Sequence, residues 1–169
     1  MFEHWDSYYI LIGSASGALI GLLFVVATLQ AGRDPEESAR GASIYLTPTV
    51  LHFTVVLVMS AMASAPGLPR WAAGLITGAA AVVGLFNAVR AMRHIGGGTV
   101  IAPHWTDFWC YGVAPLLGYL GLALAAIAMA AGAPCAAYVV AADLMVLLLI
   151  GVRNAWDLVT WLAPRAPKA

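Results

Sequence analysis

Charged residues are scarce in this chain of 169 residues: only 9% are Asp, Glu, Lys or Arg, whereas 62% are hydrophobic. Soluble domains contain about 25% charged and about 45–50% apolar residues. So few charges cannot cover a surface that faces water, and a formal net charge of zero offers nucleic acid no basic patch. The composition therefore predicts an integral membrane protein that partners the lipid bilayer and binds no nucleic acid.

Cysteine is scarce as well, with two residues in the whole chain. Cys110 and Cys135 lie at the two ends of a predicted helix, which places them roughly 37 Å apart at a rise of about 1.5 Å per residue. A disulfide requires Cα atoms within about 7 Å of each other. An intrachain bridge is therefore excluded, and both cysteines are interpreted as small apolar residues near helix ends.

The sequence lacks the motifs of enzymes and metal sites. It contains no Gly-x-Ser-x-Gly element, and neither cysteine has a histidine within one helical turn. No two histidines have the His-x-x-x-His spacing that puts two ligands on one helix face. We therefore expect no enzymatic activity, no cofactor and no metal. A lipid headgroup or metal bound among His52, Arg90 and Asp157 would revive the alternative of a membrane-embedded enzyme.

What the sequence does contain is a series of long apolar runs. Crossing about 30 Å of hydrocarbon takes about 20 residues, and backbone groups in lipid must bond within their own segment, as they do in a helix. The segments between the runs are too short to fold independently. We therefore predict an all-α fold, one transmembrane domain over residues 1–169 with five spanning helices. These cover residues 7–29, 44–64, 71–92, 108–131 and 135–162.

Basic residues gather on one side of this predicted topology. Loops that carry Lys and Arg stay in the cytoplasm, so the chain is predicted to have its N-terminus outside and its C-terminus in the cytoplasm. Only Arg70 falls on the outer side. The basic residues on the predicted cytoplasmic side are Arg33, Arg40, Arg90, Arg93, Arg153, Arg165 and Lys168.

The last four predicted helices resemble a duplicated pair. When the sequence is shifted so that Pro48 falls on Pro115, Gly84 falls on Gly151 and Asn87 on Asn154. Because both copies start on the same side, this predicts a parallel repeat about an axis along the membrane normal. Much of the stretch 72–83 does not match its counterpart, so coincidence remains the alternative.

The same shift pairs His52 with Tyr119 and Arg90 with Asp157. The second pair places opposite charges at matching depth. This predicts an ion pair between the third and fifth helices.

Polar residues inside the predicted spans are the functional candidates. An ionisable group at the bilayer centre costs at least ~2.5–3.5 kcal/mol, so it must face protein or water. Asp143 lies roughly 12 Å from the outer end of its helix, near the midplane. Pro48 and Pro115 each remove a backbone donor and loosen their helices. The predicted polar pathway or cleft consists of Asp143, His52, Asn87, Arg90, Asn154, Asp157, Thr47 and Thr49.

A structural interpretation stands beside this functional one. Polar residues near helix ends often only join helices, and His52 is equally well read as a core histidine whose hydrogen bonds are satisfied. Small residues at four-residue spacing also allow close helix contact. Gly13, Gly17 and Gly21 in the first helix, and Gly74 and Gly78 in the third, predict packing within the bundle or homo-oligomerisation through the first helix.

Three stretches carry a resemblance to a group of uncharacterised bacterial multi-pass membrane proteins. They are Gly21-Leu22-Leu23-Phe24-Val25, Thr47-Pro48-Thr49 with His52-Phe53, and Arg153-Asn154-Ala155-Trp156-Asp157. The resemblance implies a bacterial inner-membrane location and no activity.

Two functions remain open from the sequence. The first is an oligomeric channel or transporter for an ion or small solute, in which Asp143 and Asp157 handle a cation or proton, His52 gates or relays, and the asparagines hold the cleft. The alternative is a non-catalytic membrane subunit or regulator that contacts a membrane-protein partner through its helices.

Overall fold

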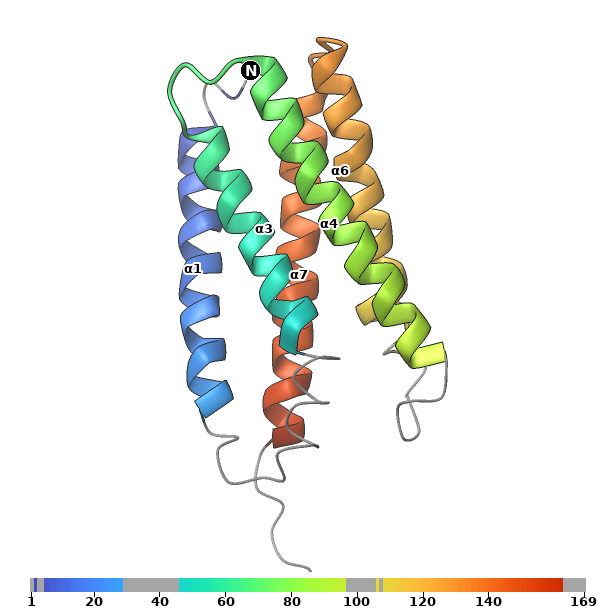
Figure 1. Ribbon diagram of the computed structural model, residues 1–169. Helices are drawn as coiled ribbons and strands as arrows, with labels where there is room; N and C mark the ends of the chain where they lie inside the picture. The colour runs from blue at the N-terminus through green and yellow to red at the C-terminus, as the bar shows by residue number, and fades with distance from the viewer. Residues whose placement is uncertain (1, 3–4, 29–45, 97–105, 107, 163–169) are drawn as a thin grey trace, which may run out of the picture.

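The computed structural model describes residues 2, 5–28, 46–96, 106 and 108–162. These residues form a bundle of helices, and no strand is present among them (Figure 1). The all-α prediction is therefore confirmed. The elements in order are α1 (Asp6–Thr28), α3 (Thr47–Ala63), α4 (Arg70–Gly96), the π-helical segment η2 (Phe108–Val113), α6 (Ala114–Ala130) and α7 (Ala136–Leu162).

Within the described residues, four stretches are long and apolar enough to cross a membrane: Asp6–Thr28, Arg70–Ile95, Phe108–Ala130 and Ala136–Thr160. The second predicted span, residues 44–64, corresponds to the shorter apolar helix Thr47–Ala63. Residues 44 and 45, at the start of that prediction, lie outside the described part of the chain, as do Arg33, Arg40, Arg165 and Lys168. The helices thus agree with a multi-pass membrane protein by length and composition.

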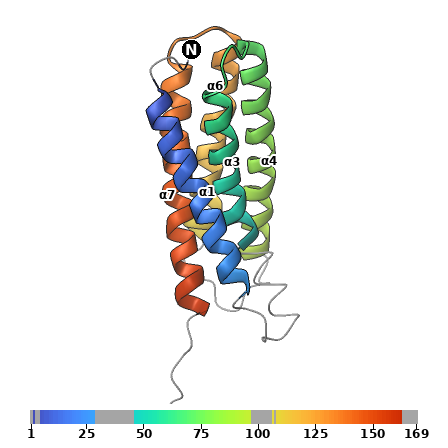
Figure 2. The same cartoon turned by 90° about the vertical axis from the view of Figure 1, so that its left-hand side faces the viewer.

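The helices run up and down beside one another (Figures 1 and 2). Helix α4 packs against α6 and α3, and α7 packs against α6 and α3, while α1 covers α3 and touches α7. Helices α4 and α7 consequently lie on opposite sides of the bundle, as Figure 2 shows. Helices α3 and α6 form the other diagonal.

The centre of the bundle is filled by large side chains. Tyr9, Tyr119, Phe53, Leu122 and Leu147 are all buried, and nearly all belong to one continuous hydrophobic cluster. The outward surface is apolar too: Leu22, Phe86 and Leu117 are each more than 60% exposed. Contiguous exposed apolar surface of this kind is unusual for a soluble monomer and suits contact with lipid.

A proline shapes the start of α6. In a π-helical turn the carbonyl of a residue accepts from the N–H five positions on, which for Cys110 in η2 is Pro115. Proline has no N–H, so the Cys110 carbonyl is left without a backbone donor at that position. The opposite end of α6 meets α7 at Gly132, whose φ of 74° is readily available only to glycine.

Candidate functional site

Asp143 lies at the edge of the seam between α6 and α7. It is half-buried, and its carboxyl rests directly on Gly121 of α6, so close that a Cβ at Gly121 would overlap it. Its Oδ2 atom is buried without a hydrogen-bond partner among the described residues, whereas Oδ1 is not enclosed. Leu117 and Leu124, which flank Gly121 on α6, are 61% and 65% exposed. The carboxyl therefore opens toward the outer surface of the bundle.

The depth of this carboxyl follows from its neighbour. Gly121 lies near the middle of the continuous helical stretch Phe108–Ala130. Asp143 is thus held near the middle of a predicted membrane span. An ionisable group at such a depth normally faces protein or a water-filled cavity.

His52 and Tyr119 meet at the centre of the bundle. The Tyr119 hydroxyl lies 2.8 Å from Nδ1 of His52, and the two ring centroids are 5.7 Å apart. Both residues are buried, at 2% and 0% exposure. The Nε2 atom of His52 has no hydrogen-bond partner among the described residues. The pair links α3 to α6 across the diagonal, and the Tyr119 ring lies directly over Gly84 of α4.

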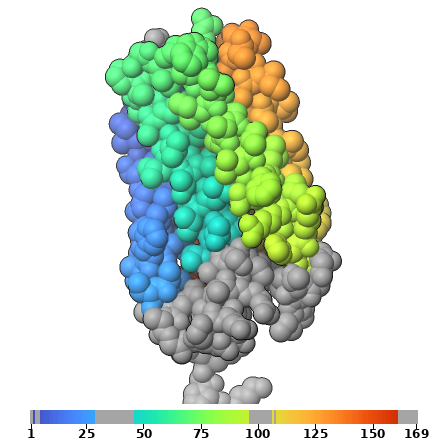
Figure 3. All heavy atoms as spheres, viewed as in Figure 1, coloured from blue at the N-terminus to red at the C-terminus, as the bar shows by residue number. Residues whose placement is uncertain are grey.

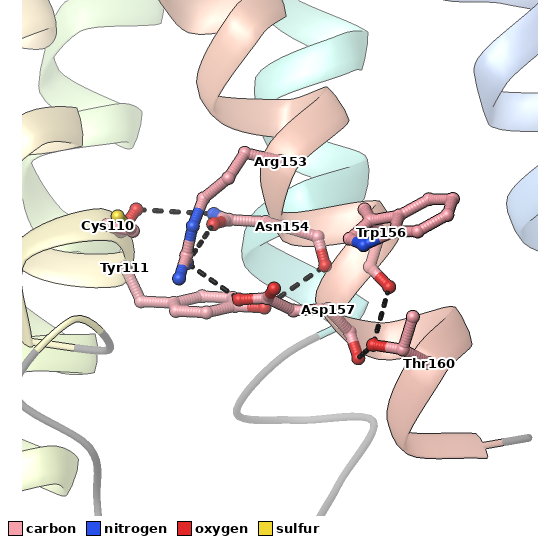
Figure 4. A network of polar contacts seen from close by, with 7 residues as sticks. All are labelled: Cys110, Tyr111, Arg153, Asn154, Trp156, Asp157 and Thr160. Carbon is pink, nitrogen blue, oxygen red and sulfur yellow. Dashed lines mark hydrogen bonds and ion pairs between the residues drawn. The ribbon is translucent and has the colours of Figure 1, made fainter.

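Asn154 joins α7 to η2 (Figure 4). Its Nδ2 donates to the Cys110 carbonyl at 3.2 Å, which is the carbonyl that Pro115 leaves unpaired. The Tyr111 hydroxyl donates to the Asn154 carbonyl, also at 3.2 Å. Asn154 is fully buried, so these bonds replace what water would otherwise supply. The amide therefore stabilises the junction of two helices.

Arg153 and Asp157 form an ion pair of 2.8 Å on one helix turn at the end of α7, and Arg153 also donates to the Asn154 side chain (Figure 4). The predicted ion pair between Arg90 and Asp157 is therefore wrong. Arg90 instead contacts His94 on its own helix, at 3.5 Å. The physical reason is the packing: α4 and α7 occupy opposite sides of the bundle.

The remaining predicted pathway residues are spread over α3 and α4. Thr49 is buried and Thr47 is exposed. Asn87 is half-buried and donates to the Val83 carbonyl of its own helix, unlike its counterpart Asn154. The eight candidates thus lie in several separate places. Asp143 is at the outer seam, His52 is in the centre, and Asn154 and Asp157 are near the end of α7.

The glycines of the two small-residue ribbons differ in their surroundings. Gly13 lies against Ser60 of α3, and Gly74 and Gly78 lie against Ala126 of α6. Gly21 has nothing within 4 Å of its Cβ position among the described residues. Part of the first-helix ribbon is therefore left on the surface.

Sequence reasoning missed several residues of these sites. Gly121 and Gly84 carry no side chain, so neither reads as polar or functional. Because they have no Cβ, Gly121 leaves room for the Asp143 carboxyl and Gly84 leaves room for the Tyr119 ring. The one sequence feature that could have identified them is a glycine inside an apolar helix, because such a glycine often marks the close approach of a neighbouring helix. In the described part of the chain, no three His, Cys, Asp or Glu side chains gather to hold a metal.

Fold and site together define a class: a small all-α bundle with apolar, membrane-length helices and a polar group at its outer seam. No protein-family model, curated protein or solved structure matches the chain. The chemistry of its own residues is therefore the basis for any assignment of function.

Proposed function

We propose that this protein assembles into an oligomer in the membrane and moves a proton or small cation, with Asp143 as the group that binds it. The observation that supports this most is the half-buried carboxyl at the α6–α7 seam, one oxygen of which is enclosed without a hydrogen-bond partner among the described residues. A carboxylate in that position must acquire a proton, a cation or a donor from outside its own bundle.

The size of the transported species is limited by the filled core. Tyr119, Phe53 and Leu147 occupy the middle of the bundle and are buried. The predicted polar residues do not line one continuous cleft. A proton or small cation handled at the seam between copies needs no wide path through a single bundle, which favours an ion over a larger solute.

His52 acts on this site through α6. The hydrogen bond between His52 and Tyr119 fixes α6 relative to α3, and Gly121 follows Tyr119 within the same helical turn. A change at His52 therefore alters how Gly121 seats the Asp143 carboxyl. In this proposal His52 gates the site and Asp143 binds the ion.

The parallel repeat is part of the proposal. The packing of α4 on α6 has its counterpart in the packing of α7 on α3, as an axis between the halves requires. His52 and Tyr119, which are equivalent under the shift, touch each other as residues beside such an axis do. Gly84 lies under Tyr119, and its counterpart Gly151 lies under Phe53, next to His52.

The experiment is proton flux into proteoliposomes, driven by a potassium gradient with valinomycin and followed with an internal pH-sensitive dye. Asp143→Asn is expected to reduce flux to that of empty vesicles. Asp157→Asn is the matched control, because that carboxyl pairs with Arg153 near the helix end. Equal flux in the wild type and Asp143→Asn would rule out this role for Asp143.

A second function is favoured by the surface of α1. Ser14, Ala18 and Gly21 are exposed small residues on that helix, and none of the described residues lies within 4 Å of the Cβ position of Gly21. Such a surface lets another helix approach closely. The protein would then be a non-catalytic subunit of a larger membrane complex. Gly21→Leu should release a partner that co-purifies at fixed stoichiometry, and leave proton flux unchanged.

The bacterial inner membrane and an outward N-terminus complete the proposal. The distribution of the basic residues supports the outward N-terminus, and the resemblance of the three stretches named in the sequence analysis supports the bacterial location. Reaction of Trp71→Cys with an impermeant maleimide in intact cells, in a Cys110→Ser, Cys135→Ser background, would place the α3–α4 turn outside. Reaction only after lysis would reverse the orientation.

A further inference from the structure

A groove of about 700 Å³ lies between α4 and α6, at the end of the bundle that holds the α3–α4 and α6–α7 turns. Helices α4 and α6 lie side by side here, and Figure 3 shows α4 on the surface with α6 beside it. Small residues, among them Gly74 and Ala126, form the floor of the groove, and the exposed Ala130 lies at its edge. Leu75 and Ile127 are 66% exposed each and add apolar walls.

The positively charged side chain of Arg70 lies at the mouth of this apolar groove. Arg70 begins α4, and its Nη1 reaches over the α6–α7 turn to within 3.2 Å of the Cβ position of Gly132. Arg70 forms no ion pair within the described part of the chain. Trp71 follows it, lines the groove and is 68% exposed. Tryptophan and arginine at a helix end are typical of the membrane–water boundary.

We propose that this groove binds one anionic phospholipid, with its phosphate on Arg70 and part of an acyl chain along Gly74 and Ala126. Charge complementarity selects the headgroup, since a guanidinium binds phosphate through charge-assisted hydrogen bonds. The apolar floor selects the chain. The site lies on the α4 side of α6, whereas Asp143 lies on the α7 side, so lipid binding is independent of the proposed ion site.

The test is native mass spectrometry of protein purified in micelles that contain equal amounts of phosphatidylglycerol and phosphatidylcholine. The wild type should retain one phosphatidylglycerol in preference to phosphatidylcholine. Arg70→Gln should weaken its retention about fivefold, as expected for a contact of about 1 kcal/mol between one basic residue and anionic lipid. Arg93→Gln is the control, because Arg93 is an exposed arginine in the last turn of the same helix.

A second variant tests the acyl-chain part of the site. Ala130→Phe fills the groove from its exposed edge and should also release the lipid. Ala79→Phe places the same ring on an exposed position of α4 outside the groove lining and should not. Unchanged retention in Arg70→Gln, equal retention of the two lipids, or unchanged retention in Ala130→Phe would each overturn the proposal.

Discussion

Two polar groups lie at the same level of this bundle, on different sides of one helix turn. Tyr119 points to the centre, where it bonds His52, and Gly121 faces the outer seam, where it seats Asp143. The central pair supplies one hydrogen bond inside a filled core, and Nε2 of His52 has no further partner among the described residues. The seam carboxyl has one enclosed oxygen without a described partner. The central pair therefore holds α3 and α6 together and acts on the seam only through α6, while the seam carboxyl needs a partner from outside the described bundle.

Substitution of the central glycine should have the largest effect on stability. A Cβ at Gly84 would overlap the Tyr119 ring, which is buried and cannot move aside. Gly84→Ala should therefore lower the free energy of unfolding by about 2–3 kcal/mol, as overpacking does. Steric trapping or SDS titration in bicelles would measure it.

Gly78→Ala is the control for that experiment. The Cβ added there lies 3.8 Å from the Ala126 Cβ, an ordinary contact, so little change is expected. Equal effects of the two substitutions would show that Tyr119 is not rigidly held in the centre.

Removal of the Tyr119 hydroxyl should have the next largest effect. Tyr119→Phe leaves Nδ1 of His52 buried without a partner, which costs about 1–3 kcal/mol. Tyr138→Phe is the matched control, since that ring is 65% exposed. A stability of Tyr119→Phe equal to wild type would mean that the pair contributes no net hydrogen bond.

Asn154 and Asn87, which are equivalent under the shift, extend the comparison to a buried and a half-buried position. Asn154→Ala should destabilise the protein by about 1 kcal/mol, because it leaves the Cys110 carbonyl without its donor. Asn87→Ala should have almost no effect, because Asn87 is only half-buried and its hydrogen bond lies within α4. Thermal unfolding of both variants measures the difference. A larger loss of stability in Asn87→Ala than in Asn154→Ala would contradict the assigned contacts.

Much of the fold was predictable from the sequence. Length and hydropathy alone locate α1, α4, the η2–α6 stretch and α7, because membrane thickness fixes how long an apolar helix must be. The depth of Asp143 follows from its distance to the helix end. These quantities depend on position along the chain and not on neighbours.

The rest depended on which helices are neighbours. The Arg90–Asp157 pair was inferred from matching depth, but the two helices occupy opposite sides of the bundle. The partner of Asp157 is instead Arg153, four residues earlier on the same face of α7. The bond from Asn154 to Cys110 required a π-helical turn before Pro115, which sequence periodicity does not reveal.

The smallest stability effect is expected at the seam. Gly121→Ala displaces the end of a side chain that can move outward, so the cost should stay below about 1 kcal/mol. Proton flux should fall nonetheless, because the added Cβ displaces the Asp143 carboxyl from its position against Gly121. If Gly121→Ala destabilised the protein as strongly as Gly84→Ala, the distinction between the seam and the centre would be lost.

The central claim is that the Asp143 seam faces another copy of the chain. Leu124 and Ala142 lie on the exposed surface at its two sides, whereas Phe86 is exposed on α4. The most direct measurement is disulfide cross-linking in native membranes of Leu124→Cys with Ala142→Cys, in a Cys110→Ser, Cys135→Ser background. We predict a covalent dimer or larger product from this pair and none from Phe86→Cys. Products that are absent, or equally abundant with Phe86→Cys, would contradict assembly through Asp143.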